Sequence, residues 1–353
     1  DTFSSRGLGD VYKRQPENDE TATLTLTNSN TSINDGTGIL TITDDDTASF
    51  TFNPISQGVY LHGGSLGDID NDGDIDIIAG DYDNGKLTWF ENDGAANPSF
   101  SSTHILNDVD SISKVILGDI DNDGDLDIAY SREADSNNVG WLENNGNSDP
   151  SFDSHILSSD EDFAHSIDIA DFDSDGDLDI ASGQNLGGSR VTLFINDGSA
   201  DPTFSTYLVS TTESAIDVKF ADIDNDGDID LVSADINTHS VTWHENNNGS
   251  WTSNVITTTA TRVRGVDVAD IDGDGDLDIT SASTNDADVS WYENDGAANP
   301  SFTVHDHTAI IPEAHDVNPT DIDGDGDIDL IIAEKNLNNY IFIEGAGGNR
   351  VAW

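Results

Sequence analysis

A nine-residue aspartate cluster that returns about every 50 residues limits how this chain can fold more than any other feature. Each copy reads D-[I/F]-D-x-D-G-D-[I/L]-D. The six copies begin at Asp68, Asp119, Asp171, Asp222, Asp270 and Asp321, at spacings of 51, 52, 51, 48 and 51 residues. Such a fixed internal period is the signature of a repeat architecture, in which each repeat forms one structural unit.

Two further markers have the same period as the clusters. W-x-E-N or a relative follows about 21 residues after each cluster begins. Its first residue is Trp89, Trp141, Trp243 or Trp291, replaced by Leu193 and Phe342 in the other two copies. A turn then follows, such as NDGAANPSF at Asn92–Phe100 and Asn294–Phe302. Three linked markers at one period exclude a chance repeat.

Each repeat is predicted to hold four short strands. In the second repeat these are Val115–Asp119, Leu126–Tyr130, Asn138–Asn144 and Ser151–Leu157. Turn-forming residues separate them, and no segment keeps a helical period. Four strands per unit of about 50 residues predict an all-β fold, a β-propeller with six four-stranded blades.

The two ends of the repeat region leave the number of blades open. The last repeat has sequence for three strands but only GNRVAW in place of the fourth. An unassigned strand, Ala48–Phe52, precedes the first repeat and resembles a fourth strand. We expect it to complete the last blade and close a six-bladed ring. The alternative is a chain truncated at Trp353 that has lost a seventh blade.

The aspartates form an all-oxygen ligand set for a metal ion. Carboxylates at loop positions 1, 3, 5 and 9 surround a point, and the residue at position 7 contributes its backbone carbonyl. Glycine at position 6 permits the tight turn. Five or six oxygen ligands plus water favour a hard divalent ion, and a flexible, carboxylate-rich loop favours Ca²⁺ over Mg²⁺. An acidic surface without metal would require neither the regular spacing nor the glycine.

The predicted metal-site residues are the five aspartates of each loop. They are Asp68, Asp70, Asp72, Asp74 and Asp76; Asp119, Asp121, Asp123, Asp125 and Asp127; Asp171, Asp173, Asp175, Asp177 and Asp179; Asp222, Asp224, Asp226, Asp228 and Asp230; Asp270, Asp272, Asp274, Asp276 and Asp278; and Asp321, Asp323, Asp325, Asp327 and Asp329. About six Ca²⁺ ions, one per loop, are expected.

An EF-hand shares the opening D-x-D-x-D-G but also needs glutamate at position 12 and flanking helices. Position 12 is Ala79, Tyr130, Ser182, Ser233, Ser281 or Ile332, and none of these is acidic. The flanking segments read as strands. The EF-hand interpretation therefore fails in all six copies.

The composition excludes several classes of partner. The net charge is −58, so nucleic acid and anionic membrane surfaces would be repelled. No apolar run is long enough to insert into a membrane. Cysteine is absent, so disulfides cannot stabilise the fold.

The loops and strands together resemble a known family. D-x-D-x-D-G-x-x-D between two strands of a blade is similar to the FG-GAP/VCBS repeat, found in integrin α-subunit propellers and many secreted bacterial proteins. The resemblance covers residues 48–353. It implies one calcium ion per loop, in the hairpin between the first and second strands of each blade.

A second resemblance covers the segment before the propeller. Residues 16–47, mainly Glu17–Thr47, resemble the C-terminal end of a Calx-β domain, with a strand–turn–strand pattern and the acidic run Asp44–Asp46. The upstream partners of that run are missing, so no metal site is assigned there. Residues 1–15 hold three of the twelve basic residues, and we interpret them as a non-native leader, with a basic linker as the alternative. We expect the chain to be part of a longer multidomain protein.

Beyond calcium, the residues favour binding over catalysis. No linked nucleophile and base are present, so we do not expect an enzyme. His165 and His315 precede first strands, near the centre of the propeller, and the matched tryptophans are expected to pack between blades. We predict an adhesion or binding module, extracellular or on the cell surface, with a glycan or an extracellular protein as ligand. A sugar-acting propeller enzyme and a structural spacer are the alternatives.

Overall fold

The structure is a computed structural model. It describes residues 21–22, 40–41, 61–81, 85–95, 98–107, 111–133, 138–158, 163–185, 190–211, 214–285, 288–306, 313–321, 326–334, 340–343, 345–346 and 350–351. The regular elements in these ranges are all strands. No helix among the described residues has the length and apolar character needed to cross a bilayer.

The strands form successive antiparallel sheets, one per repeat. Five sheets have four strands each, and the sixth has three within the described residues. The first two are β3 (Leu61–Gly67), β4 (Asp76–Asp81), β5 (Lys86–Asn92) and β6 (Phe100–Asn107), then β7 (Ile112–Gly118), β8 (Asp127–Arg132), β9 (Val139–Asn144) and β10 (Phe152–Ser158). The third and fourth are β11 (Ala164–Ala170), β12 (Asp179–Gln184), β13 (Val191–Asn196) and β14 (Phe204–Ser210), then β15 (Ala215–Ala221), β16 (Asp230–Asp235), β17 (Ser240–Asn247) and β18 (Ser250–Thr257). The last two are β19 (Val263–Ala269), β20 (Asp278–Ser283), β21 (Asp288–Asn294) and β22 (Phe302–Asp306), then β23 (Ala314–Thr320), β24 (Asp329–Glu334) and β25 (Tyr340–Ile343).

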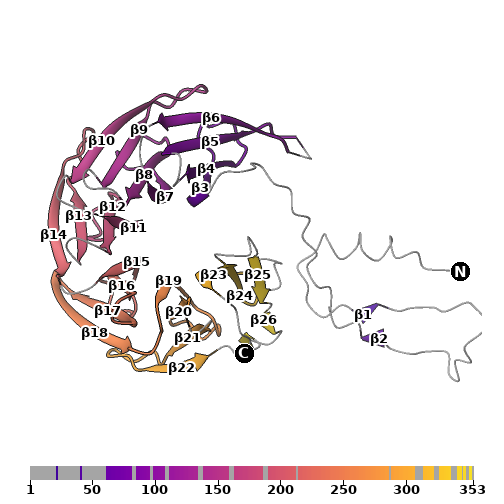
Figure 1. The fold of residues 1–353 in the computed structure, drawn as a ribbon, viewed down its shortest axis with the longest axis vertical. Coiled ribbons are helices and arrows are strands. Elements are labelled where there is room, and N and C mark those ends of the chain that lie inside the picture. The colour runs from indigo at the N-terminus through magenta and orange to yellow at the C-terminus, as the bar shows by residue number, and fades with distance from the viewer. Residues whose placement is uncertain are drawn as a thin grey trace, which may run out of the picture.

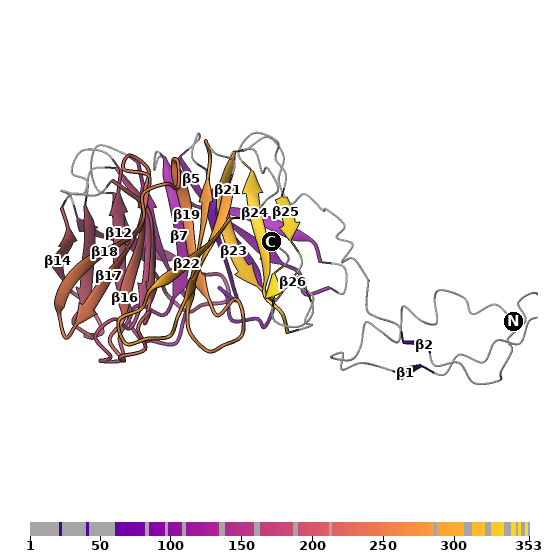
Figure 2. The ribbon, with the colours of Figure 1, turned by 90° about the horizontal axis from the view of Figure 1, so that it is seen from below.

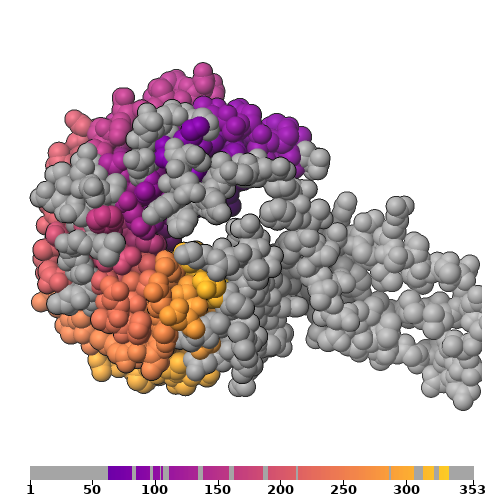
Figure 3. All heavy atoms as spheres, in the orientation of Figure 1, coloured from indigo at the N-terminus to yellow at the C-terminus, as the bar shows by residue number. Residues whose placement is uncertain are grey.

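The sheets are arranged around a common centre, as in a β-propeller. The first strand of each sheet lies innermost, and in the five four-stranded sheets the fourth strand lies outermost (Figure 1). The first strands of successive sheets contact one another, from β3 and β7 through to β19 and β23. The space-filling view shows the sheets following one another in chain order (Figure 3). The prediction of an all-β propeller with four strands per repeat is thus confirmed for the first five repeats.

The core lies between neighbouring sheets. One cluster joins Trp89 of the first sheet to Ile112 and Tyr130 of the second, and equivalent clusters join the later pairs. The four matched tryptophans are 1–6% exposed. The prediction that they pack between blades is therefore confirmed. Outer strands such as β10 and β14 are largely exposed, because they form the edge of each sheet that lies farthest from the centre.

Each first strand carries a β-bulge near its start. The pairing of first and second strands slips by one residue in all six sheets. The six unpaired residues are Gly63, Ser113, His165, Ile216, Arg264 and His315. We call them the bulge ring. The first strand of the second repeat therefore begins at Ile112, three residues before the predicted start at Val115. The strand begins with the polar residues Ser113 and Lys114 after Ile112, so a prediction based on runs of apolar residues placed its start too late.

The strands of each sheet run between two faces of the propeller (Figure 2). Because the sheets are antiparallel meanders, the aspartate loops after the first strands lie on one face, here called the loop face. The bulge ring and the ends of the second strands lie toward the other, here called the bulge face. Repeated and variable sequence are thus separated between the two faces.

Several sequence predictions lie outside the described residues. They include the leader at 1–15, the strand at Ala48–Phe52 and the acidic run Asp44–Asp46. Within residues 16–47, β1 (Thr21–Ala22) pairs with β2 (Leu40–Thr41). A further pair joins β26 (Gly345–Ala346) to β27 (Arg350–Val351).

Candidate metal centres

The backbone of each of the first five aspartate loops turns through two residues with positive φ. Position 4 has φ of 55–60° at Asn71, Asn122, Ser174 and Asn225, and φ of 72° at Gly273. Position 6 is glycine, with φ of 95–101° in all six loops. A side chain is strongly disfavoured at the latter angle. The predicted role of this glycine is therefore confirmed.

The first aspartate of each loop is held by that glycine. In all six loops the backbone N–H at position 6 donates to Oδ2 at position 1, over 2.9–3.1 Å. The other oxygen, Oδ1, is buried and has no hydrogen-bond partner in Asp119, Asp171 and Asp270. A buried carboxylate oxygen without a donor is costly and indicates an absent positive partner.

The aspartates at positions 3 and 5 each accept a bond from the backbone two residues later. Oδ1 of Asp121 accepts from the N–H of Asp123 at 3.2 Å, and Oδ1 of Asp123 accepts from the N–H of Asp125 at 3.0 Å. The fifth loop repeats both bonds. One oxygen of each carboxylate is thereby fixed while the other remains available to a ligand.

Three carboxylates of each described cluster lie close together, at positions 1, 3 and 5 in the first loop and at positions 1, 3 and 9 in the next four. In every group the ligand atoms lie within 4.8 Å of one another. The groups are Asp68, Asp70 and Asp72; Asp119, Asp121 and Asp127; Asp171, Asp173 and Asp179; Asp222, Asp224 and Asp230; and Asp270, Asp272 and Asp278. Like charges this close repel by about 3–4 kcal/mol per pair at an effective dielectric constant near 20. Burial and the neighbouring carboxylates accordingly raise the pKa of the position-3 aspartates Asp70, Asp121, Asp173, Asp224 and Asp272.

The last aspartate, at position 9, is the most deeply buried. Oδ2 of Asp127 accepts from the N–H of Ile120 at 2.9 Å, and Oδ1 accepts from the N–H of Asn144 at 2.8 Å. Burial raises the pKa of Asp127 to about 7, and does the same at Asp179, Asp230 and Asp278. In the first and fourth loops a tryptophan also donates, from Trp89 to Asp76 at 3.0 Å and from Trp243 to Asp230 at 2.9 Å. The aspartate at position 9 therefore connects the carboxylate cluster to the core between the sheets.

The aspartate at position 7 uses its side chain to connect neighbouring blades. Nδ2 of Asn71 donates to Oδ1 of Asp125 in the next loop at 2.7 Å, and Asn225 donates to Asp276 at 2.9 Å. The Asp125 carboxylate also lies over Gly146, where any side chain would collide with it. Its side chain is thus occupied outside the cluster, which leaves the backbone carbonyl for the role predicted from sequence.

Sequence reasoning missed the asparagine of W-x-E-N. Nδ2 of Asn144 donates to the carbonyl of Leu126 in its own loop at 3.1 Å and to that of Ile69 in the preceding loop at 2.9 Å. Asn196 and Asn294 make equivalent pairs of bonds. The period of the marker was the only available signal, because its bonding partners lie 71–76 residues away.

The sixth loop is described only in part. Asp321 accepts from Gly326, and Asp329 is buried, as at the equivalent positions of the other loops. Asp323 and Asp325 lie outside the described residues. Asp327 is described and half-buried.

The donor set fits calcium. Every candidate ligand is an oxygen, the carboxylates converge, and three buried oxygens have no hydrogen-bond donor. Hard divalent cations with six to eight oxygen ligands take such sites. Positions 1, 3, 5 and 9 would hold the ion with carboxylates, and position 7 with its carbonyl. The bound cation would neutralise the repulsion and stabilise the loop.

Two substitutions within one loop distinguish an aspartate that would bind the ion through its carboxylate from one that would bind it through its backbone carbonyl. We expect Asp119→Asn to reduce the number of bound Ca²⁺ ions by one, because it removes the charge of the oxygen that has no donor. Asp125→Asn should retain the full number, since it keeps the backbone carbonyl. Calcium titration by calorimetry measures both. Equal stoichiometry in the two variants would contradict the assigned roles.

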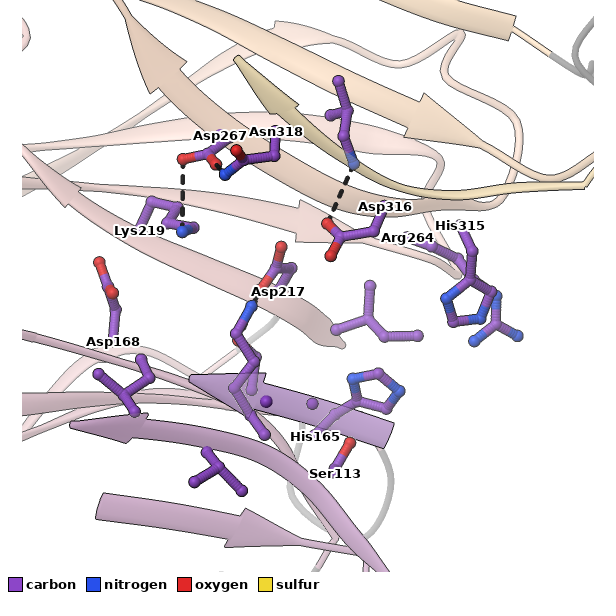
Figure 4. Close-up of a pocket in the computed structure, with 18 of the residues that line it drawn as sticks. Ser113, His165, Asp168, Asp217, Lys219, Arg264, Asp267, His315, Asp316 and Asn318 are labelled. Atoms are coloured by element: carbon purple, nitrogen blue, oxygen red, sulfur yellow. Dashed lines mark hydrogen bonds and ion pairs between the residues drawn. The ribbon is translucent and has the colours of Figure 1, made fainter. Parts of the chain in front are cut away.

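A second candidate site is a cavity of about 420 Å³ at the centre of the propeller, lined by the first strands (Figure 4). Charged side chains lie within it. Lys219 pairs with Asp267 at 3.3 Å, and Asn318 donates to the same carboxylate at 3.0 Å. Lys114 lies 3.6 Å from Asp217, which also accepts from Ser166 at 2.6 Å.

These pairs cross between sheets, so they hold the first strands in place around the cavity. The Asp217 carboxylate raises the pKa of Lys114, which stays protonated. Burial raises the pKa of Asp168 and of Asp316, which lie in the same cavity. The interior of the cavity is therefore polar and rich in hydrogen-bond acceptors.

The two histidines noted in the sequence both line this cavity. His165 and His315 belong to the bulge ring, and Nε2 of His165 lies 3.1 Å from Oε1 of Glu133. A third histidine has a different role. His155 stacks on Trp141 with ring centroids 4.5 Å apart and pairs with Glu143, so it packs on the outer strand of the second sheet.

Comparison with known proteins agrees with this fold. Residues 68–130 and 222–281 match the family model described as an FG-GAP-like repeat. These ranges contain four of the six aspartate loops. No curated protein matches the sequence at a significant level.

Several solved structures share the architecture. A lectin from Agrocybe aegerita that recognises non-reducing terminal N-acetylglucosamine is 18% identical, with a TM-score of 0.55 over 82% of this chain and 78% of that one. A protein from Lactobacillus plantarum is 9% identical, with a TM-score of 0.57 over 83% of each chain. A putative 6-phosphogluconolactonase from Bacteroides uniformis is 11% identical, with a TM-score of 0.57 over 86% of this chain and 84% of that one. At these identities the likeness shows the fold alone.

Proposed function

We propose that this chain is a six-bladed, calcium-binding propeller module of a secreted or cell-surface bacterial protein. Its function is adhesion, through binding of a glycan or a protein on the bulge face, without catalysis. One calcium ion per loop stabilises each blade on the loop face. Extracellular calcium suits such sites, since extracellular modules bind it with Kd values of about 10⁻⁴–10⁻³ M.

The observation that carries this proposal is the contrast between the two faces. On the loop face the same bonds recur from repeat to repeat, including the bond from glycine to aspartate in all six loops. On the bulge face, equivalent positions carry glycine, serine, histidine, isoleucine or arginine. Repetition serves folding, whereas variation at equivalent positions supports selective binding of a ligand.

The cavity supports binding over catalysis. Its lysines and several of its carboxylates pair with one another, as Lys219 does with Asp267, so these groups serve to hold the strands in place. A glycan is the first ligand class to test, because a polar cavity with many acceptors suits hydroxyl groups. A lectin with this fold is known, and it recognises N-acetylglucosamine.

A glycan array tests the proposal. The full chain, loaded with Ca²⁺, is expected to bind a subset of glycans and to lose them in EDTA, because the blades that shape the bulge face depend on calcium. A blank array together with capture of an extracellular protein would replace the glycan by a protein ligand. Turnover of a bound polysaccharide would instead favour the enzyme alternative and contradict a pure binding role.

A further inference from the structure

Two buried polar atoms of the bulge ring have no hydrogen-bond partner, and they come from sheets on different sides of the cavity. Oγ of Ser113, on β7 of the second sheet, is one, and Nε of Arg264, on β19 of the fifth, is the other. Both residues line the central cavity (Figure 4). Buried polar groups in native proteins are nearly always paired, so two in one cavity indicate a missing ligand.

The β-bulge explains how these side chains reach the cavity. Ser113 and Arg264 are the residues left out of the strand pairing in their sheets. A bulge turns a side chain away from the regular alternation of a strand, and bulges are common beside functional sites. In the first sheet the bulged residue is Gly63, with φ of 59°, where a Cβ would lie 2.6 Å from the carbonyl oxygen of Ser113.

The charged groups near Arg264 provide no hydrogen-bond acceptor for its Nε–H. The charged groups around its guanidinium are Arg262, Glu133 and Glu313, and Glu133 is already paired with His165. Burial, with a contribution from Arg262, lowers the pKa of the Arg264 guanidinium. An arginine whose buried N–H has no acceptor is suited to a carboxylate, which it binds through parallel hydrogen bonds.

The rest of the cavity selects against a ligand that carries a second negative charge. Carboxylates of Asp168, Asp217 and Asp316 line it, and they would repel a polyanion. The same carboxylates can accept hydrogen bonds from the hydroxyl groups of a sugar. A volume of about 420 Å³ lies in the range of about 300–1,000 Å³ that is usual for small-ligand pockets.

We propose that the cavity binds a sugar carrying a single carboxylate, such as a hexuronate unit, with its carboxylate at Arg264, one hydroxyl group at Ser113 and other hydroxyl groups toward the aspartates. This inference rests on the proposed function and specifies its glycan class. The bulge ring thus forms the specificity site, and the paired lysines and aspartates beside it hold its walls in place.

Calorimetric titration of sodium glucuronate into the calcium-loaded full chain tests this assignment, with glucose as the uncharged counterpart. Physiological salt or higher screens the net charge of −58, which otherwise repels the probe. We expect saturable binding of glucuronate and at least about tenfold weaker binding of glucose, since a hydrogen bond to a charged group is lost.

Three variants distinguish the loss of a contact in the cavity from the effect of a change in net charge. Arg264→Gln should weaken glucuronate binding at least about tenfold, and Ser113→Ala should weaken it several-fold. Arg190→Gln makes the same charge change outside the cavity lining and should leave Kd unchanged. Melting curves in Ca²⁺ show whether each variant folds. If Arg264→Gln does not fold, Ser113→Ala still tests the site.

The outcomes distinguish this inference from the proposed function. Equal affinity of wild type and a folded Arg264→Gln or Ser113→Ala variant would overturn the site. Array hits confined to neutral glycans, with no glucuronate binding, would overturn the acidic-sugar class and leave the glycan-binding module standing. A blank array with no glucuronate binding and no captured protein would overturn both.

Discussion

We expect EDTA to lower the melting temperature of this protein by more than about 20 °C. Each of the first five loops places three carboxylates within 4.8 Å of one another, so removing the cation restores their repulsion. A ligand that binds only the folded state at 100 times its Kd stabilises that state by about 2.7 kcal/mol per site. Six such sites supply on the order of 16 kcal/mol, and each kcal/mol shifts the melting temperature by about 2 °C in a chain of this size. Circular dichroism melts in Ca²⁺ and in EDTA measure the change.

The control is the return of the metal. Adding excess Ca²⁺ after EDTA should restore the original melting temperature. Mg²⁺ should restore less, because it demands a compact octahedral set and gives up its waters reluctantly. A melting curve that is the same in Ca²⁺ and in EDTA would show that the aspartate loops do not depend on metal.

The second large effect is a loss of stability that we expect when one buried asparagine is replaced. Asn144→Ala should lower the free energy of unfolding by about 3–5 kcal/mol in saturating Ca²⁺, because several buried polar groups lose their partner at once. The side chain donates to the carbonyls of Ile69 and Leu126, and its Oδ1 accepts from Gly146. Urea unfolding followed by tryptophan fluorescence measures the loss.

Asn246 provides a matched control. It occupies the same position in the fourth sheet and donates to Ile229 in its own loop at 3.1 Å, and its Oδ1 accepts from Gly249 at 2.8 Å. Among the described residues it makes no bond equivalent to the one between Asn144 and Ile69. Asn246→Ala should therefore cost about 1–3 kcal/mol, less than Asn144→Ala. Equal losses would mean that the bond between blades contributes nothing.

Most of the fold could be predicted from sequence because its signals are local. Loop position 6 must be glycine for a backbone reason, and its φ of 95–101° shows that reason directly. Strands such as Val139–Asn144 were predicted to within a residue because apolar, β-branched runs end at turn residues. The first strands were harder, since their opening residues are polar and face the central cavity.

The candidate sites divide in the same way. The aspartate loops could be found because their ligands lie within nine residues of one another. The partners of Asn144 and the grouping of Ser113 with Arg264 could not, because these contacts join residues from different repeats. The local sequence of one repeat does not indicate which side chain of another repeat will contact it.

The sequence by itself determined the repeating unit, its four strands, the oxygen-rich loops and the glycines that allow them. These follow from short-range sterics and from the period of apolar residues. The tertiary structure alone decided that position 7 connects neighbouring blades, that the W-x-E-N asparagine bridges two loops, and that six bulged residues meet at one cavity. The physical reason is that arranging the sheets around a centre brings equivalent positions of distant repeats together, and only there do their differences become a site.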